Sequence, residues 1–286
     1  MISIEQLRYV RLGTRDLPAA IDFAQRILGL QLIERSEHQA FFRSDDRDHT
    51  LVYFVGEPND QAVGLEVRSG EALAEAAASL HAHGYAVEQG TADAAAQRKV
   101  KSFIAFRDAS GNRIELVLRP LNSGWRYHAP RDAGVTGLAG VALRSRAIAA
   151  DENLWTRILG GKVSDWVGDA AYVSLAAAHH RIALHPSNHA GVLAVEYGVE
   201  GVDQIMQAQY FMQNAQVRVA HGPGRRPSSG QLFITFAGPD GVLFSFVAEG
   251  EPSGAQRLPR QFARKAGSFC SWGSESQVPE FSGEPV

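Results

Sequence analysis

Histidines are the side chains of this chain best suited to acid–base chemistry. His179 and His180 are adjacent, and His185 and His189 follow shortly after them. An imidazole titrates near neutral pH, so one held in an apolar pocket can move protons on an enol or a phenol. We therefore take His180 as a candidate catalytic acid or base. The alternative is a hydrogen-bonded core histidine, which is supported by His49 at the corresponding place in an earlier segment of the chain.

That correspondence comes from an internal repeat. The sequence Arg-Ile-Leu-Gly at 26–29 returns at 157–160, and His49 and His180 are separated by the same number of residues. Similarity that stays in register over so long a stretch indicates two copies of one unit. Duplicated halves share a core and leave one copy free to specialise, so we look for chemistry where the copies differ.

Each copy contains two modules with the same expected order of elements. In the first, a strand over 7–14 precedes a helix that Asp16 caps and Gly29 ends, and three short strands follow. The other modules are expected over 63–119, 135–186 and 191–250. The pattern predicts four βαβββ modules and therefore an α+β fold.

The modules predict two tandem domains. We place the N-terminal domain at 1–122, a turn-rich linker at 123–134, and the C-terminal domain with the candidate pocket at 135–250. The tail over 251–286 is rich in Pro, Gly and Ser, but it carries more aromatic residues than a solvated tail needs. We expect the tail to pack on the C-terminal domain.

Composition excludes several classes of function. The chain has 286 residues, of which 45% are hydrophobic and 21% charged, and its net charge is −3. These values indicate a soluble globular protein without the basic surface that nucleic acid requires. Because we find neither a membrane-spanning apolar run nor a targeting peptide, we expect a cytoplasmic protein. Cys270 is the only cysteine and is expected to take no part in chemistry.

Several segments resemble a known superfamily. They are the helix over 17–30, the stretches 42–50 and 108–115, and the tail segment 270–273. Together with the module order they are similar to the vicinal oxygen chelate superfamily of glyoxalases, bleomycin-resistance proteins and dioxygenases, and they resemble most the two-domain type I extradiol catechol dioxygenases. The resemblance implies two tandem domains with open, barrel-like sheets. Fold alone does not establish an activity.

The resemblance also implies an iron site, which this sequence lacks at the matching positions. Extradiol dioxygenases bind iron(II) through two histidines and one glutamate of the second domain, which leaves room for a catecholate and dioxygen. The matching positions are Gly140, Ala194 and Ser245, and none of them supplies such a ligand. We therefore expect no metal and no other cofactor, unless His185 or His189 is displaced into the pocket.

Further pocket residues follow from the same resemblance. His180 matches a histidine that acts as an acid or base beside the metal in extradiol enzymes. The side chains expected to bind the substrate are Tyr172, Glu196, Tyr197, Thr235 and Phe246. Arg225 and Arg226 are expected on a flexible turn at the rim of the pocket.

Three functions are compatible with these features. The first is a metal-independent enzyme that uses His180 on a small aromatic or enolic compound in aromatic catabolism. The second is a protein that binds an aromatic ligand without transforming it. The third is an active iron(II) extradiol dioxygenase with displaced ligands. In each case the partner is a small molecule, with no nucleic acid and no membrane, and exposed sheet edges favour a homo-oligomer.

Overall fold

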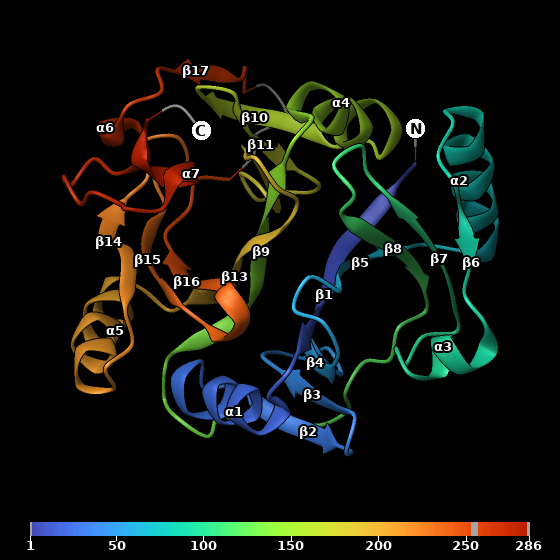
Figure 1. Ribbon diagram of the computed structural model, residues 1–286, viewed down its shortest axis with the longest axis horizontal. Coiled ribbons are helices and arrows are strands. Elements are labelled where there is room, and N and C mark those ends of the chain that lie inside the picture. The colour runs from blue at the N-terminus through green and yellow to red at the C-terminus, as the bar shows by residue number, and fades with distance from the viewer. Residues whose placement is uncertain (1, 253–256, 285–286) are drawn as a thin grey trace.

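The chain folds into two similar halves built from four copies of one βαβββ module (Figure 1). The computed structural model describes residues 2–252 and 257–284. The first module contains β1 (Ile4–Thr14), α1 (Leu17–Asp22), η1 (Phe23–Ile27), β2 (Gln31–Arg35), β3 (Gln39–Arg43) and β4 (Leu51–Val55). The second contains β5 (Gln61–Val67), α2 (Gly70–Ala82), β6 (Glu88–Gln89), α3 (Ala92–Ala96), β7 (Ser102–Arg107) and β8 (Arg113–Leu118).

The second half repeats this order. The third module contains β9 (Val135–Ser145), α4 (Ile148–Asn153), η2 (Leu154–Ile158), β10 (Lys162–Val167), β11 (Ala170–Ser174) and β12 (Ile182–Pro186). The fourth contains β13 (Gly191–Val199), α5 (Val202–Asn214), β14 (Val219–Arg225), β15 (Leu232–Ala237), η3 (Pro239–Gly241) and β16 (Leu243–Ala248). The tail adds β17 (Arg260–Phe262), α6 (Ala266–Phe269) and α7 (Pro279–Ser282). Of the helices in the described part of the chain, none has the length and apolar character of a membrane span.

The repeated Arg-Ile-Leu-Gly sequence ends the first helix of each half. In the first copy α1 widens into the π-helical turn η1, where the Leu28 N–H donates to the carbonyl oxygen of Phe23 (3.1 Å). Gly29 then leaves the helix with a φ of 75°, and Gly160 does the same after η2 with a φ of 73°. This left-handed conformation strains residues that carry a side chain, which explains why the glycine recurs in both copies.

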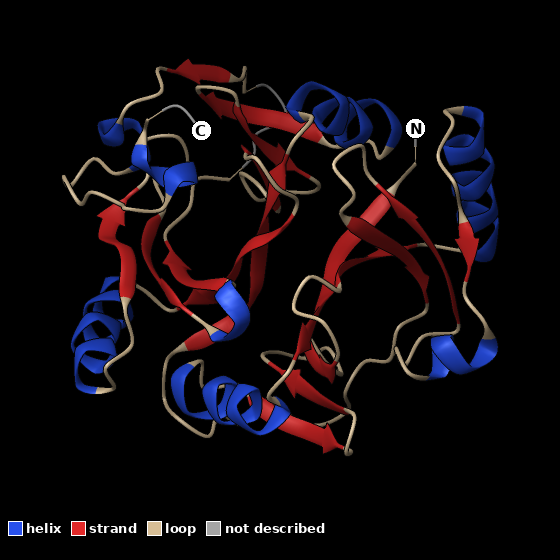
Figure 2. Cartoon of the chain, viewed as in Figure 1, coloured by secondary structure: helices blue, strands red, loops and turns tan. Residues whose placement is uncertain are grey.

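Each half forms one open sheet (Figure 2). The strand order is β2-β3-β4-β1-β5-β8-β7-β6 in the N-terminal half and β14-β15-β16-β13-β9-β12-β11-β10-β17 in the C-terminal half. The first strand of each module pairs in parallel with the last, and the two modules of a half join through antiparallel first strands. Within the described residues, the two end strands of each sheet do not pair with each other. The sheet therefore curls around an interior without closing. The predicted α+β fold with open, barrel-like sheets is confirmed.

The two halves share one apolar core. Buried residues of both halves belong to a single continuous cluster. Within it, Phe23 of η1 packs against Phe236 and Phe244 of the C-terminal sheet, with ring centroids 6.5 and 5.3 Å apart. The first helix of one half therefore also covers the sheet of the other.

The tail extends and covers the C-terminal sheet. β17 pairs in parallel with β10 and becomes the ninth strand of the C-terminal sheet. The short helices α6 and α7 follow, and they bring Phe269 and Phe281 into a buried cluster with Tyr172 of β11. The interior of the C-terminal sheet is thus closed by aromatic side chains from the end of the chain.

Candidate site in the C-terminal domain

Three positions form one row across the C-terminal sheet. Glu196 of β13 pairs with Gly140 of β9 on one side and with Ser245 of β16 on the other. The resemblance indicated Ala194 as the middle position, but Ala194 lies two pairs further along the strand. The pairing of β9 with β13 contains three register shifts, which counting residues along the chain cannot detect. The side chain between the two outer positions is therefore a carboxylate.

Glu196 is a buried, ion-paired carboxylate. It is only 4% exposed; its Oε1 accepts a hydrogen bond from Arg226 Nη2 (2.7 Å), and its Oε2 lies 3.5 Å from His180 Nε2. Burial alone would raise the pKa of Glu196, but the Arg226 guanidinium and the His180 imidazole together lower it well below its usual range. A Cβ atom at Gly140 would stand 3.0 Å from Glu196 Oε2, so the glycine makes room for this carboxylate. Glu196 is ionised, and Arg226 is its counter-charge.

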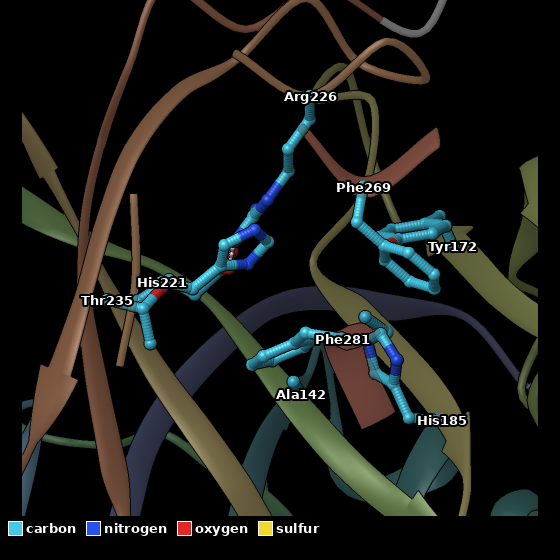
Figure 3. Close-up of a pocket in the computed structure, with 10 residues that line it drawn as sticks. Ala142, Tyr172, His185, His221, Arg226, Thr235, Phe269 and Phe281 are labelled. Carbon is cyan, nitrogen blue, oxygen red and sulfur yellow. Dashed lines mark hydrogen bonds and ion pairs between the residues drawn. The ribbon is translucent and has the colours of Figure 1, made fainter. Parts of the chain in front are cut away.

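A small cavity of about 10 Å³, room for roughly one water molecule, lies beside this pair (Figure 3). Three of the five predicted substrate-binding residues line it, namely Tyr172, Glu196 and Thr235. His185 also lines the cavity, whereas His189 is exposed. Of the two histidines considered for displacement into the pocket, His185 is therefore the one that reaches it.

The other two predicted substrate-binding residues lie away from this cavity. Tyr197 and Phe246 directly follow Glu196 and Ser245, and neighbouring residues of a strand face opposite sides of the sheet. Both are buried in the core shared by the two halves, where the ring of Phe246 lies 5.2 Å from that of Phe236. Strand alternation therefore turns these two side chains to the face of the sheet opposite the cavity.

The cavity also contains residues that the sequence did not indicate as site residues. Arg226, expected on a flexible turn, is only 9% exposed and also donates to Gln231 Oε1 (2.6 Å). His221 of β14 and Phe281 of α7 face each other with ring centroids 5.9 Å apart. Burial lowers the pKa of both His221 and His185 to about 4, so both are neutral at pH 7. The aromatic content of the tail was a signal for Phe281, but no sequence pattern marked His221.

A groove of about 400 Å³ opens at the end of the same sheet, and His180 forms part of its wall. Ala139 and Val247 line it from β9 and β16, and Ser229 and Gln231 line it from the connection between β14 and β15. This volume suits a small organic molecule. His180 lies between the groove and Glu196, and its Nε2 is buried on the side of Glu196.

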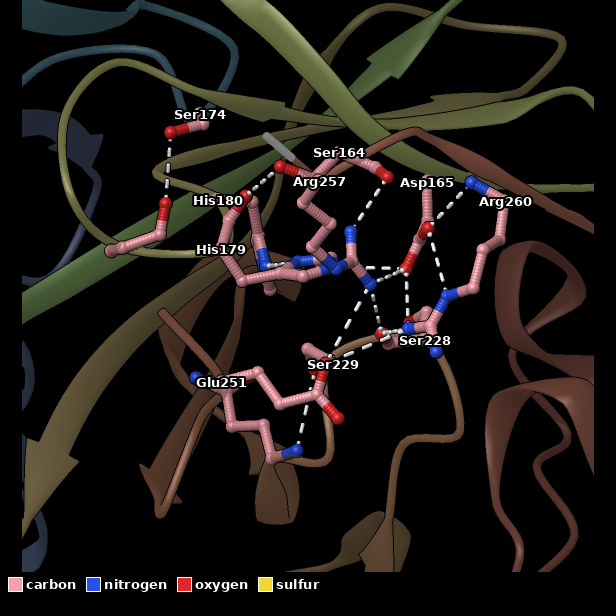
Figure 4. Close-up of polar contacts among 12 residues, drawn as sticks. Ser164, Asp165, Ser174, His179, His180, Ser228, Ser229, Glu251, Arg257 and Arg260 are labelled. Carbon is pink, nitrogen blue, oxygen red and sulfur yellow. Dashed lines mark hydrogen bonds and ion pairs between the residues drawn. The ribbon is translucent and has the colours of Figure 1, made fainter. Parts of the chain in front are cut away.

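A chain of polar contacts leads from His180 to the tail (Figure 4). His180 Nδ1 lies 3.0 Å from His179 Nδ1, and His179 Nε2 lies 2.9 Å from Asp165 Oδ2. Asp165 Oδ2 also accepts hydrogen bonds from Arg257 (2.7 Å) and Arg260 (3.0 Å). Burial alone would raise the pKa of Asp165, but the two guanidinium groups and His179 lower it to about 2. Burial, reinforced by His180, lowers the pKa of His179 to about 4.

The N-terminal half fills the equivalent interior. Tyr9 occupies the position of Gly140 in the repeat, and its ring lies over Gly64, where a Cβ atom would stand 2.5 Å from it. Tyr9 Oη donates to Glu115 Oε2 (2.7 Å), and Arg98 pairs with the same carboxylate (2.6 Å). Both halves thus hold a buried Glu–Arg ion pair inside the sheet, and in the C-terminal half the glycine at the position of Tyr9 leaves space for Glu196.

The residues at the positions that the resemblance assigns to metal ligands do not fit a site of two histidines and one carboxylate. Gly140 and Ala194 carry no donor side chain, and Ser245 Oγ is 2.7 Å from Thr235 Oγ1 in a hydrogen bond. Glu196 is the carboxylate of the row, and a guanidinium already neutralises it. Across residues 2–252 and 257–284, no group of three or more His, Cys, Asp or Glu side chains is arranged to hold a metal ion.

Known proteins with similar sequences and structures include several dioxygenases. Residues 6–116 match the family model described as Glyoxalase/Bleomycin resistance protein/Dioxygenase superfamily. An iron-dependent extradiol dioxygenase from Rhodococcus jostii is 25% identical over 97% of this chain and 99% of its own length. A 3-methylcatechol 2,3-dioxygenase from Pseudomonas putida is 31% identical over 61% of this chain and 64% of its own length. The crystal structure of a halotolerant catechol dioxygenase matches with a TM-score of 0.89 at 21% identity, over 98% of this chain and 97% of that one, which shows the shared fold.

Proposed function

We propose a function for this chain on the premise that it carries a domain of the glyoxalase/bleomycin resistance protein/dioxygenase superfamily and is extradiol-dioxygenase-like. It acts on a small aromatic or enolic compound of aromatic catabolism by moving a proton with His180, without a bound metal ion. The substrate lies in the groove that His180 lines. The C-terminal half supplies the residues that do the chemistry.

The observation that carries this proposal is the buried ion pair of Arg226 and Glu196. The positive charge that a metal ion would supply to this carboxylate comes from a guanidinium fixed 2.7 Å away. A second cation placed in the same row would be repelled by Arg226, and such repulsion is strong where burial lowers the dielectric constant. The arrangement therefore supports chemistry by side chains alone.

The proposed step is general acid–base catalysis. The lone pair on His180 Nε2 takes a proton from a C–H next to a carbonyl group or from a phenolic O–H, and the bonding electron pair stays on the substrate as an enolate or phenolate. Because Nε2 is buried beside Glu196, the step requires a movement that opens the groove as far as this atom. The imidazolium is stabilised by Glu196, whose Oε2 lies 3.5 Å away. Return of the proton to another atom of the enolate restores the neutral imidazole and releases an isomer. The step requires no oxidant.

Deuterium exchange tests for turnover. The protein is incubated in D₂O with phenylpyruvate, an aromatic compound that enolises, and loss of its methylene proton signal is followed by NMR. We expect exchange above the buffer rate that persists after treatment with EDTA, and exchange slower by on the order of 10²-fold in His180→Gln. His81→Gln, at an exposed histidine of α2, should keep the wild-type rate. If neither phenylpyruvate nor a panel of related enols and phenols exchanges, the catalytic proposal is wrong.

Metal analysis separates this proposal from an iron-dependent dioxygenase, a candidate favoured by the similarity to the Rhodococcus jostii protein along the whole chain. The purified protein is analysed by inductively coupled plasma mass spectrometry, loaded anaerobically with iron(II), and assayed with catechol and 3-methylcatechol. We expect substoichiometric iron and no yellow ring-cleavage product. One iron per chain together with ring cleavage would overturn the metal-independent proposal.

A binding protein without catalysis is the second candidate, which the size of the groove favours. A ligand that binds the folded state raises the melting temperature according to its concentration and affinity. A thermal-shift screen with the same phenols and enols therefore detects binding directly. A compound that stabilises the protein and is recovered without exchange or conversion would favour the binding function over the catalytic one.

A further inference from the structure

Asp165 is held ionised by the groups around it. It is fully buried, its Oδ2 accepts from Arg257 Nη2 (2.7 Å) and Arg260 Nη2 (3.0 Å), and its Oδ1 accepts from the Arg260 backbone N–H (2.8 Å). An ionised carboxylate can only accept hydrogen bonds. Because Oδ2 also lies 2.9 Å from His179 Nε2, this nitrogen must carry a proton and donate it.

His179 consequently presents an acceptor to His180. Burial, with His180 beside it, lowers the pKa of His179 to about 4, so its ring is neutral at pH 7 and carries one proton. That proton is on Nε2, which leaves a lone pair on Nδ1. His180 Nδ1 lies 3.0 Å from His179 Nδ1, so it must be the donor in this contact.

The remaining nitrogen of His180 is its basic one. With a proton on Nδ1, the neutral ring keeps its lone pair on Nε2. This atom is buried and has no hydrogen-bond partner among the described residues, and Glu196 Oε2 lies 3.5 Å from it. A proton taken up at Nε2 gives an imidazolium between the lone pair of His179 and the carboxylate of Glu196, and both neighbours stabilise that charge.

We propose that Asp165 and His179 are positioning residues that hold His180 in the Nδ1–H tautomer, so that its basic nitrogen, Nε2, faces Glu196. The proposal rests on the proposed function and deepens it, since it names the residues that prepare His180 for proton transfer. Arg257 and Arg260 of the tail take part by keeping Asp165 ionised.

Nitrogen NMR of the histidine side chains tests the proposal without any substrate. Long-range ¹H–¹⁵N correlations of protein labelled with ¹⁵N-histidine distinguish the two tautomers, and the spectra of His179→Leu and His180→Gln assign the signals. In the neutral rings of the wild type we expect His179 as the Nε2–H tautomer and His180 as the Nδ1–H tautomer. Finding His180 as Nε2–H would overturn the proposal.

Asp165→Asn is the decisive variant. The asparagine amide can donate to His179 Nε2, which favours the Nδ1–H form of His179 and, through it, the Nε2–H form of His180. We expect the Nδ1–H signal of His180 to weaken or vanish, and kcat for phenylpyruvate exchange to fall by on the order of 10-fold or more while KM is retained. Tautomers unchanged from the wild type would overturn the proposal.

Glu251→Gln is the matched control. Glu251 is another carboxylate near Arg257 and Arg260 (3.6 and 3.7 Å), so the same change of carboxylate to amide is made in the same cluster. We expect the wild-type tautomers in this variant. Circular dichroism checks that each protein is folded.

If Asp165→Asn does not fold, His179→Leu replaces it. This variant removes His179 Nδ1, the acceptor for the His180 Nδ1 proton, so the Glu196 carboxylate should draw that proton to His180 Nε2. Retention of the Nδ1–H form of His180 would contradict the proposal.

The two readouts distinguish failure of this proposal from failure of the proposed function. The expected tautomers in a protein without turnover would contradict the enzymatic function alone. Turnover and tautomers that Asp165→Asn leaves unchanged would contradict the positioning role alone.

Discussion

Tyr9 and Gly140 occupy the same place in the two copies of the repeat. Because one is a large aromatic residue and the other a glycine, different side chains fill the interiors of the two sheets. The ring of Tyr9 fills the N-terminal interior and stacks on His49 at a centroid distance of 5.3 Å. In the C-terminal half the glycine leaves space for the side chain of Glu196. The histidine equivalent to His49, His180, therefore meets a carboxylate on one side and a groove on the other. At the scale of residues, the difference between the copies lies where chemistry is possible.

Replacing Arg226 tests the central ion pair. Arg226→Met keeps much of the side-chain volume but leaves the Glu196 carboxylate buried without a counter-charge, so we expect the free energy of unfolding to fall by about 3–5 kcal/mol. Urea unfolding at pH 7, followed by circular dichroism, measures the loss. Adding Glu196→Leu to the variant should recover most of it, because the unpaired charge is then removed.

The neighbouring arginine provides the control for this prediction. Arg225 ends β14, directly before Arg226, and pairs with Glu249 at the surface, where such a pair contributes about 0–1 kcal/mol. Arg225→Met should therefore have a small effect. If Arg226→Met cost no more stability than Arg225→Met, Arg226 would not act as the counter-charge of the buried Glu196 carboxylate.

At the scale of elements, the tail decides how closed the site is. The helices α6 and α7 have only four residues each, too few to be stable alone, so contacts with the sheet hold them in place. Glu280 Oε1 accepts hydrogen bonds from Arg144 Nε (2.8 Å) and from Ser187 Oγ (2.9 Å). These bonds fix Phe281 against the cavity.

Truncating Phe281 tests the role of the tail. Phe281 is 7% exposed and lines the cavity, so Phe281→Ala should lower the free energy of unfolding by about 3–5 kcal/mol through lost contacts and a larger cavity. Trp272 is 50% exposed in the same tail, and Trp272→Ala should change stability by roughly 0.5 kcal/mol or less. Chemical unfolding of the two variants beside the wild type measures both. Equal losses would show that Phe281 does not seal the cavity.

At the scale of the whole molecule, the two halves are joined by packing and by directed hydrogen bonds. Asn112 Oδ1 accepts from the Gly191 N–H (2.7 Å), and Gln61 Oε1 accepts from the Val192 N–H (2.6 Å). Both bonds reach the start of β13, the strand that carries Glu196, so the N-terminal half helps to fix the strand of the site. Assembly into a homo-oligomer stays a prediction.

Calorimetry tests this coupling. Because one apolar core includes residues of both halves, we expect a single unfolding transition with equal calorimetric and van't Hoff enthalpies. Asn112→Ala should lower the free energy of unfolding by about 1–3 kcal/mol, since it leaves the Gly191 N–H without its partner, yet preserve the single transition. Two resolved transitions in the wild type would mean that the halves unfold independently.

The sequence by itself determined the repeat and the four βαβββ modules, because these depend on residue types and on periodicity over a few neighbouring positions, which a linear sequence displays directly. The open sheets and the positions of Gly140 and Ser245 in the candidate site were implied by the resemblance to a known superfamily. The resemblance also indicated the region around His180, but Tyr197 and Phe246, which it suggested as substrate contacts, lie in the core shared by the two halves.

Only the tertiary structure decided the Arg226–Glu196 pair, the contact of His179 with Asp165 and the closure by Phe281. Arg226 and Glu196 are separated by 30 residues, and Arg226 directly follows β14, a strand that does not neighbour β13 in the sheet. Phe281 arrives from the end of the chain. Contacts of this kind depend on how strands and tail pack in space, and local sequence preferences do not specify that packing.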